Sequence, residues 1–237
     1  MAVPSAQLSQ SRLAAYTGVR SDIFGLVPET AMSILDLGCA DGSLAAALKR
    51  ENPARWTAGV EYSPVLAQTA RERLDQVLQG DLNRPELLQA LGGKKFDCVI
   101  CADVLEHLQQ PNQLLQHLQN HLAPNACIVV SLPNIRHLSA LIAIFWQGSF
   151  PRRQRGIFDD THLRWFTLRD GEQMLTDAGL KVEARTYNLR WGDQGGGRAN
   201  RALIKLLGPH AHRLSIVREF LTYQVAMRAR CMEPGKL

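Results

Sequence analysis

The sequence lacks an apolar run long enough to cross a bilayer. Its longest apolar stretch, Leu138 to Trp146, falls short of the about 20 residues that a membrane-spanning helix needs. The first residues, MAVPSAQLSQSR, also lack the basic-then-apolar order of a signal peptide. There is no internal repeat and no low-complexity tract. We therefore expect a cytoplasmic protein and leave peripheral contact with a membrane open.

Cysteine is too scarce and too scattered for a disulfide framework. The chain has five cysteines, an odd number that indicates free thiols in a reducing compartment. Cys98 and Cys101 form a C-x-x-C, but both lie in the apolar run FDCVICA, which is typical of a buried strand. Residues an odd number apart on a strand point to opposite faces. We therefore expect neither a shared metal nor a disulfide at this pair.

The net charge of +5 is unevenly distributed. Residues 1–147 have a net charge of −2, whereas residues 148–237 have +7. The basic C-terminal part fits two interpretations. It is either ordinary solvated surface, or a surface that faces an anionic acceptor or a membrane.

Strand-like and helix-like segments alternate along the chain. We expect strands at 33–37, 57–61, 76–80, 96–102, 126–132, 180–186 and about 220–228. We expect helices at 43–50, 63–74, 85–90, 111–122 and 167–178, after an N-terminal helical segment within residues 1–30. This order predicts an α/β fold with a doubly wound, mostly parallel seven-stranded sheet and an antiparallel last strand.

The regular alternation is interrupted twice, at about 134–166 and 188–216. Interruptions of this length in a compact domain are usually functional loops. We therefore expect residues 1–237 to form a single domain in which these two inserts act as lids or binding loops.

A glycine-containing loop follows the first expected strand. In ILDLGCADGSLAAALK, Gly38 and Gly42 flank Ala40, and a helix follows. Glycine permits a tight turn and close approach of a ligand to the backbone. No G-x-x-x-x-G-K-[ST] occurs, so the sequence excludes a P-loop.

Acidic residues stand at or after the ends of the first three expected strands. Glu61 comes 25 positions after Asp36, where a carboxylate can accept hydrogen bonds from ribose hydroxyls. Asp81 ends the third strand in QGDL, and Asp41 lies in the glycine loop, which contains no Lys or Arg. Such an acidic rim repels a pyrophosphate and favours a nucleoside that carries positive charge.

The motifs ILDLGCADG, VEYSP, QGDL and FDCVICADVLEHL resemble the successive motifs of class I S-adenosylmethionine (SAM)-dependent methyltransferases, over about residues 32–187. The resemblance implies a Rossmann-like fold and SAM as the cofactor. It also implies a role for each matching residue: the methionine side for Asp36, Gly38 and Gly42, the ribose for Glu61, the adenine for Asp81, and the sulfonium for the backbone of Ala102. Ala40 departs from the glycine common in the family, and we expect only a small local shift there.

A second polar cluster follows the fourth expected strand. Asp103, Glu106 and His107 are spaced to share one face of a helical turn, and His162 follows later in FDDTHLRWFT. Two carboxylates and two imidazoles suit either a divalent metal ion or general-base catalysis. Our candidate catalytic bases are His162 and then His107. The metal interpretation assigns all four residues as ligands, and the alternative leaves Glu106 and His107 as residues that order the loop.

The pattern D-x-x-E-H followed by T-H resembles two groups of methyltransferases. One is the ubiquinone-pathway O-methyltransferases, and the other is the metal-dependent small-RNA 3′-terminal 2′-O-methyltransferases, which usually have glutamate at the position of Asp103. SLPNIRH and GIFDDTHLRWFT resemble polysaccharide- and glycolipid-associated methyltransferases and, more distantly, MetW-like proteins.

These resemblances imply O-methylation of a hydroxylated small molecule, glycan or lipid-linked acceptor. The alternatives are an RNA 2′-hydroxyl acceptor, with nucleic acid as the partner, or a non-catalytic partner protein. The oligomeric state is left open.

The first insert contains HLSALIAIFWQGSFPRRQR. An apolar helix followed by arginines fits a lid, a helix at a membrane interface, or a core helix with a basic turn. In addition to His162, the side chains that could face the acceptor are Arg136, His137, Arg164 and Trp165.

Overall fold

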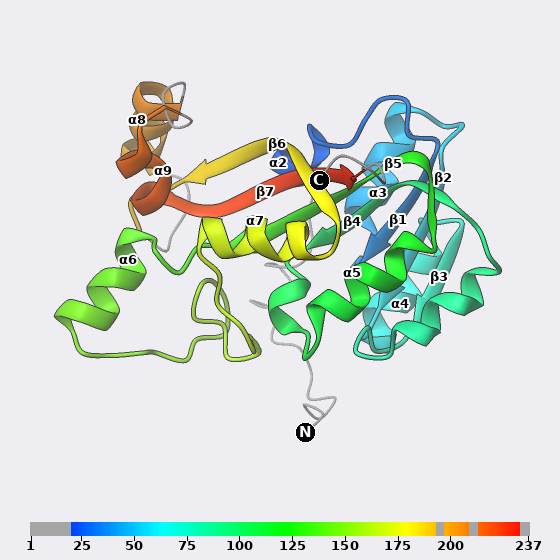
Figure 1. The fold of residues 1–237 in the computed structure, drawn as a ribbon, viewed down its shortest axis with the longest axis horizontal. Helices are drawn as coiled ribbons and strands as arrows, with labels where there is room; N and C mark the ends of the chain where they lie inside the picture. Colours follow the sequence, from blue (N-terminus) through cyan, green and yellow to red (C-terminus); the bar gives the residue numbers. More distant parts are fainter. Residues whose placement is uncertain (1–19, 193–196, 209–212, 233–237) are drawn as a thin grey trace.

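The computed structural model describes residues 20–192, 197–208 and 213–232. These residues are arranged around one seven-stranded sheet in the order β3-β2-β1-β4-β5-β7-β6 (Figure 1). The strands are β1 (Ser33–Leu37), β2 (Trp56–Glu61), β3 (Gln76–Gln79), β4 (Phe96–Ala102), β5 (Leu122–Pro133), β6 (Leu180–Leu189) and β7 (Thr222–Cys231). The pairs among β1 to β5 are parallel, and β7 pairs antiparallel with both β5 and β6. The predicted sheet and its antiparallel last strand are confirmed.

Helices cover both faces of the sheet, as a doubly wound fold requires. Buried side chains of α5 (Pro111–Gln119), α7 (Leu168–Asp177) and the 3₁₀ helix η1 (Pro85–Leu91) join the larger core on one face. Those of α2 (Ser21–Phe24) and α3 (Ser43–Glu51) form the core on the other face, and α4 (Pro64–Arg71) packs beside α3. The sheet is therefore covered by apolar side chains on both sides, which explains why β1 and β4 are mainly apolar, each with a single aspartate.

The two cysteines of the C-x-x-C lie on opposite faces of β4. Cys101 belongs to the core beneath α5 and α7, and Cys98 belongs to the core beneath α2 and α3. Both are buried free thiols. The prediction that they share neither a metal nor a disulfide agrees with this placement.

Local signals set several element boundaries. Ser63 Oγ accepts the Leu66 N–H at the start of α4, where Pro64 occupies the first turn. Thr167 and Asp170 form a reciprocal capping box at the start of α7. The predicted helix 63–74 was too long, because the helix ends at Arg71.

The predicted start of the fifth strand was wrong by four residues. β5 begins at Leu122 rather than Ala126, and Leu122 pairs with Phe96 before a shift of register. The predicted helix 111–122 correspondingly ends at Gln119. Pro124 and Asn125, two residue types that are depleted in strands, conceal this part of the strand in the sequence.

Each insert carries helices of its own. The first contains α6 (Leu138–Leu141) and a π-helical turn η3 (Ile142–Trp146), and the second contains α8 (Gly197–Leu207), with α9 (Ser215–Leu221) following. In Figure 1 these helices gather at one end of the sheet, near the end of β6 and the start of β7. Most of the helical segment expected within residues 1–30, and parts of the 188–216 insert, lie outside the described residues. No helix in the described ranges is both long and apolar enough to traverse a bilayer.

Candidate functional site

The loop after β1 has an unusual backbone. Gly38, Ala40 and Gly42 all have positive φ, at 67°, 48° and 77°. A Cβ on Gly38 would lie 2.7 Å from Val104 Cγ2, so both its conformation and its surroundings require glycine. Ala40 adopts a left-handed conformation that costs an L-residue about 1–2 kcal/mol. The loop therefore curves tightly at the carboxyl end of β1, where this class of sheet binds its ligands.

Two carboxyl groups lie beneath this loop. Asp36 is buried, and burial, together with the charge of Glu61, raises the pKa of Asp36 to about 8. Glu61 is also buried, and its carboxylate accepts the N–H of Ala40 at 2.9 Å and the N–H of Ser63 at 2.8 Å. Burial raises the pKa of Glu61, and these hydrogen bonds oppose the rise. Glu61 therefore holds the glycine loop against the end of β2.

The remaining predicted cofactor residues lie at the same edge of the sheet. Asp81, just beyond β3, accepts hydrogen bonds from the backbone and side-chain nitrogens of Asn83. Ala102 is the last residue of β4 and is partly exposed. Asp41 forms an ion pair with Arg73, a base that comes from outside the loop. The negative charge of the rim therefore depends on Glu61 and Asp81 rather than on Asp41, and Asp36 adds to it only when it ionises.

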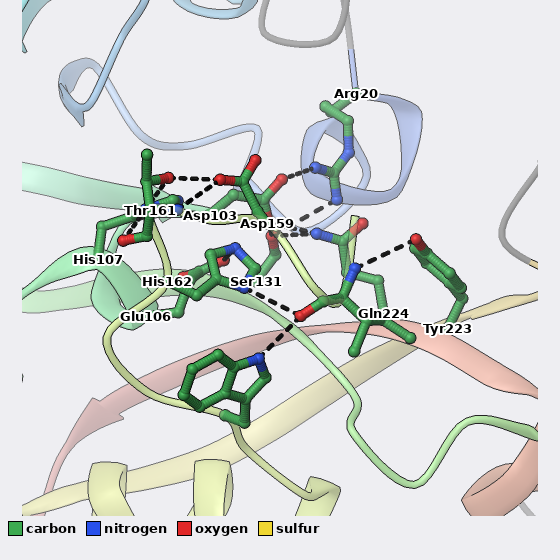
Figure 2. Close-up of polar contacts among 12 residues, drawn as sticks. Arg20, Asp103, Glu106, His107, Ser131, Asp159, Thr161, His162, Tyr223 and Gln224 are labelled. Atoms are coloured by element: carbon green, nitrogen blue, oxygen red, sulfur yellow. Dashed lines mark hydrogen bonds and ion pairs between the residues drawn. The ribbon is translucent and has the colours of Figure 1, made fainter. Parts of the chain in front are cut away.

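A second group of side chains follows β4. Glu106 and His107 lie on the short 3₁₀ helix η2 (Leu105–His107), and the loop carrying His162 is held against it. The backbone N–H groups of Leu163 and Arg164 both donate to the carbonyl of Glu106. Glu106, His107 and His162 each offer one ligand atom, and these three atoms lie within 4.8 Å of one another. Figure 2 shows the three side chains close together.

Hydrogen bonds fix the orientation of both imidazole rings. His162 Nδ1 lies 3.1 Å from the carbonyl oxygen of Ile157, which can only accept, so Nδ1 carries the proton. His107 Nδ1 lies 3.3 Å from the carbonyl oxygen of Thr161, which likewise requires a donor. The Thr161 hydroxyl also contacts His107 Nδ1 and donates to Asp159. In the neutral rings the lone pairs are therefore on Nε2.

Burial controls the charge of this group. Burial, and after it the charge of Asp103, raises the pKa of Glu106 well above its usual range. Burial, and after it the charge of His107, lowers the pKa of His162 below 6.5. His162 Nε2 lies 3.9 Å from Glu106 Oε1. Because both groups then favour their neutral forms, this approach is not an ion pair.

Asp103 is not part of this group, although the sequence predicted that it would share a helical face with Glu106 and His107. Its backbone has a φ of 56°, and η2 begins only at Leu105. Its carboxylate accepts hydrogen bonds from Arg20, Ser131 and Gln224 (Figure 2). The structure thus brings together three of the four predicted metal ligands and commits the fourth to another network.

The other side chains predicted to face the acceptor have structural partners. His137 caps α6 and contacts the carbonyl of Arg190, and Arg136 pairs with Glu219 at 3.1 Å. Arg164 donates to the carbonyls of Leu108 and Gln109. Trp165 Nε1 donates to the carbonyl of Ile157, the same acceptor that His162 uses. Trp165 therefore remains adjacent to the cluster, whereas the other three stabilise loops.

A pocket of about 340 Å³ lies elsewhere, between α5 and α7. Apart from Arg164, none of the predicted site residues lines it. The chemistry-bearing side chains therefore lie at the carboxyl edge of the sheet rather than in this pocket.

The family model described as a methyltransferase domain matches residues 11–185. The chain belongs to the class I SAM-dependent methyltransferase family. The ubiquinone biosynthesis O-methyltransferase of Schizosaccharomyces pombe is 32% identical over 47% of this chain and 41% of its own length. The corresponding Rickettsia canadensis protein is 26% identical over 64% of each chain. The trans-aconitate 2-methyltransferase of Escherichia coli is 26% identical over 68% of this chain and 62% of its own length. These matches span less than two thirds of the relatives' own lengths.

Solved methyltransferase structures share the fold. A SAM-dependent methyltransferase from Archaeoglobus fulgidus has a TM-score of 0.58 and 20% identity, covering 92% of this chain and 91% of that one. Magnesium protoporphyrin IX methyltransferase from Synechocystis PCC 6803, solved with bound SAH, has a TM-score of 0.59 and 16% identity, covering 98% of this chain and 90% of that one. The Rossmann-like architecture expected from the motifs is confirmed.

The sequence prediction missed the residues that orient this methyltransferase's cluster. Asp159 and Thr161 hold His107, and Asp159 Oδ1 also accepts the N–H of Thr161 at 2.9 Å. The D-x-T spacing in FDDTH is a signal for this turn. Arg20 and Gln224 hold Asp103 from 83 and 121 positions away, and no local signal identifies such contacts.

Proposed function

We propose that this chain is a single-domain enzyme that transfers the methyl group of SAM to a hydroxyl oxygen of a small-molecule, glycan or lipid-linked acceptor. The observation that carries the proposal is the pairing of two sites at one edge of the sheet. One is the acidic glycine loop after β1, and the other is the cluster of buried Glu106, half-buried His107 and buried His162 after β4. Family membership supports SAM as the methyl donor.

On the donor side, each residue has a role that its position supports. Gly38 and Gly42 allow the backbone to approach the methionine part, and Asp36 offers a carboxylate to its ammonium group. Glu61 binds the ribose, Asp81 binds the adenine, and the backbone of Ala102 lies near the sulfonium. SAM supplies an already activated methyl group, so the protein needs mainly to align the acceptor oxygen behind it.

On the acceptor side, His162 is the base. Its Nδ1–H is held by the carbonyl of Ile157, which leaves the lone pair on Nε2, and its lowered pKa keeps it neutral at pH 7. The acceptor hydroxyl gives its proton to Nε2 as the oxygen forms a bond to the methyl carbon. The carbon–sulfur bond breaks, and its electron pair returns to sulfur. His107 is the second candidate for this role.

A divalent metal ion fits the same three side chains. Glu106 Oε2 is buried and accepts no hydrogen bond from any residue in the described ranges, which is costly for a carboxyl oxygen. Glu106, His107 and His162 would provide one oxygen and two nitrogen ligands, a set that suits Zn²⁺, Mn²⁺ or Fe²⁺ better than Mg²⁺. Such an ion would lower the pKa of a bound hydroxyl, and because it would occupy the Nε2 lone pair of His162, it would replace His162 as the proton acceptor rather than act beside it.

A hydroxylated small acceptor is favoured over RNA. Relatives are named for ubiquinone biosynthesis and for trans-aconitate, both of which involve small molecules. The metal-dependent RNA methyltransferase interpretation requires Asp103 as the fourth metal ligand. Here the Asp103 carboxylate instead accepts hydrogen bonds from Arg20, Ser131 and Gln224. These observations support the small acceptor.

The test is incubation with methyl-labelled SAM and fractionated cell extract, with and without chelator. We expect label in a small-molecule, glycan or lipid fraction, and His162→Ala should reduce turnover by about 100-fold or more with little change in SAM affinity. His117→Ala, an exposed histidine on α5, is the matched control. Loss of activity with chelator, restored by Mn²⁺ or Zn²⁺, supports the metal. Label only in RNA contradicts the acceptor class, and SAM binding without turnover on any fraction favours a non-catalytic partner.

A further inference from the structure

The helical turn of the first insert exposes large apolar side chains. We use "apolar tip" for Ile142, Phe145, Trp146 and Phe150, which are 43%, 82%, 87% and 50% exposed. The first three belong to the π-helical turn η3 and are exposed, whereas Ala143 of the same turn is buried. Single exposed apolar residues are common, but three exposed aromatic side chains within six residues of the chain indicate an interaction surface.

The opposite side of the same turn is anchored to the protein. Ala140 and Ala143 are buried in a small core with Ile157, Phe158 and Tyr223. The N–H of Ser149 donates to the carbonyl of Ala143 at 2.8 Å, which holds the chain as it leaves the turn. The insert is therefore not the core helix that one interpretation expected, because its largest side chains point away from the core. In Figure 1, α6 extends outward from the end of the sheet.

Positive charge borders the apolar tip. Arg152, Arg153 and Arg155 follow it and are exposed. Asp159 and Asp160 lie beside them, since Arg152 donates to the carbonyl of Asp160 and the backbones of Arg153 and Asp159 form a bridge. Residues 134–166 nevertheless contain five arginines and only these two acidic residues, which gives the insert a net charge of +3. Aromatic side chains beside arginines suit the boundary between lipid headgroups and acyl chains, where both apolar burial and anionic charge contribute to binding. A symmetric contact between two copies would instead bring like charges together.

The apolar tip is connected to the catalytic cluster. The ring of Phe150 lies 4.9 Å from that of Phe158 and 5.0 Å from that of Trp165. Trp165 and His162 donate to the same carbonyl oxygen, that of Ile157. A surface that binds the tip would therefore lie next to the acceptor side of the site.

We propose that the apolar tip and its arginines dock this protein on an anionic membrane surface. The docking itself does not require methyl transfer, while the placement next to His162 rests on the proposed function and favours a lipid-linked acceptor. Phe145 and Trp146 insert among the acyl chains near the headgroups, and Arg152, Arg153 and Arg155 remain at the phosphate level.

The test is co-sedimentation of the full chain with phosphatidylcholine vesicles, with and without phosphatidylglycerol, in the absence of SAM. We expect binding to the anionic vesicles that weakens with salt. The double variant Phe145→Ser/Trp146→Ser should lower the partition coefficient about tenfold or more, because each aromatic side chain contributes through its buried area. Changing Arg152, Arg153 and Arg155 to Gln should abolish the preference for phosphatidylglycerol.

The matched control is Val65→Ser, an apolar side chain on α4 that is 73% exposed, and this variant should bind vesicles like the wild type. Circular dichroism verifies that each variant is folded. Equal sedimentation of the wild type and the double variant, or no sedimentation of the wild type, overturns the proposal. So does self-association of the wild type without lipid that the double variant abolishes, because the tip would then join two copies. Since no step of this assay involves methyl transfer, its failure is distinguishable from failure of the proposed function.

Discussion

Two neighbouring carboxyl groups, Asp36 and Glu61, differ in the number of hydrogen bonds that hold them. Both are buried at the carboxyl ends of adjacent strands. Glu61 accepts backbone N–H groups from Ala40 and Ser63, whereas within the part of the chain that the structure describes only burial and the charge of Glu61 act on Asp36. Glu61 therefore shapes the loop before any ligand arrives, and Asp36 is the group whose ionisation we expect a charged ligand to change.

Glu61→Ala should weaken SAM binding by about 2–3 kcal/mol, the scale for losing charge-assisted hydrogen bonds. The structure adds a second expectation, because the N–H groups of Ala40 and Ser63 lose their acceptor and the variant should unfold at a lower temperature. Isothermal calorimetry, performed well below the unfolding midpoint, measures the first effect. Glu72→Ala, at an exposed glutamate just after α4, should leave both quantities unchanged. Unaltered affinity for Glu61→Ala would remove the ribose assignment.

The pH dependence of SAM binding should identify Asp36. Below its pKa of about 8, unliganded Asp36 is protonated, and a cationic ligand beside it favours the ionised form. Binding must then release a proton, so affinity should rise with pH, by up to about tenfold per unit, and level off near 8.

The same shift affects stability with the opposite sign. The pKa of Asp36 is higher in the folded state than its unfolded value of 3.8, so protonated Asp36 favours folding. This contribution to the free energy of unfolding is complete below pH 3.8 and is lost as the pH rises to about 8. Asp36→Asn should remove both slopes, which calorimetry and urea unfolding at several pH values measure. A wild-type affinity that is flat with pH would contradict the role of Asp36.

At the scale of elements, the sequence predicted strands well where an apolar run had clear ends. The bounds of β1 and β4 agree with the predicted 33–37 and 96–102. β5 was harder, because its first residues include Pro124 and Asn125 and are defined by pairing rather than by apolarity. Pairing partners distant in sequence are not encoded in any local pattern.

In the candidate site, too, local patterns could be predicted and contacts between distant residues could not. The glycine loop and the cluster of Glu106, His107 and His162 could be located, because each lies just after a recognisable strand or within a motif. The direction of the Asp103 side chain could not, since Arg20 lies 83 positions away. Likewise, the exposure of Trp146 depends on which face of η3 packs on the insert's own small core.

The glycine loop allows a test of backbone strain. Ala40→Gly should raise the free energy of unfolding by about 0.5–1 kcal/mol, because glycine adopts a φ of 48° without the cost that alanine incurs, less the extra entropy of the unfolded chain. SAM affinity should change little. Ala45→Gly, a buried position inside α3, should instead lower stability by about 1 kcal/mol or more. Urea unfolding measures both, and a destabilised Ala40→Gly would show that the alanine methyl group contributes packing that outweighs the strain.

At the scale of the whole molecule, the sheet joins both ends of the described chain. β7, near the C-terminus, lies between β5 and β6 and so belongs to the same sheet as β1, the first strand along the chain. The basic C-terminal part is therefore built into the same core as the mildly acidic SAM half. The two inserts add only small cores at one end of this sheet.

Because the sheet is continuous, we expect the chain to unfold in one cooperative transition. The four tryptophans report on different places: Trp56 on β2, Trp146 on the apolar tip, and Trp165 and Trp191 on the two inserts. Their combined fluorescence and the far-ultraviolet circular dichroism should therefore give coincident urea midpoints. SAM at about a hundredfold over its Kd should stabilise both signals equally, by about 2.7 kcal/mol. Two separated transitions, of which SAM shifts only one, would mean that the inserts unfold apart from the sheet, and the single-domain proposal would then be wrong.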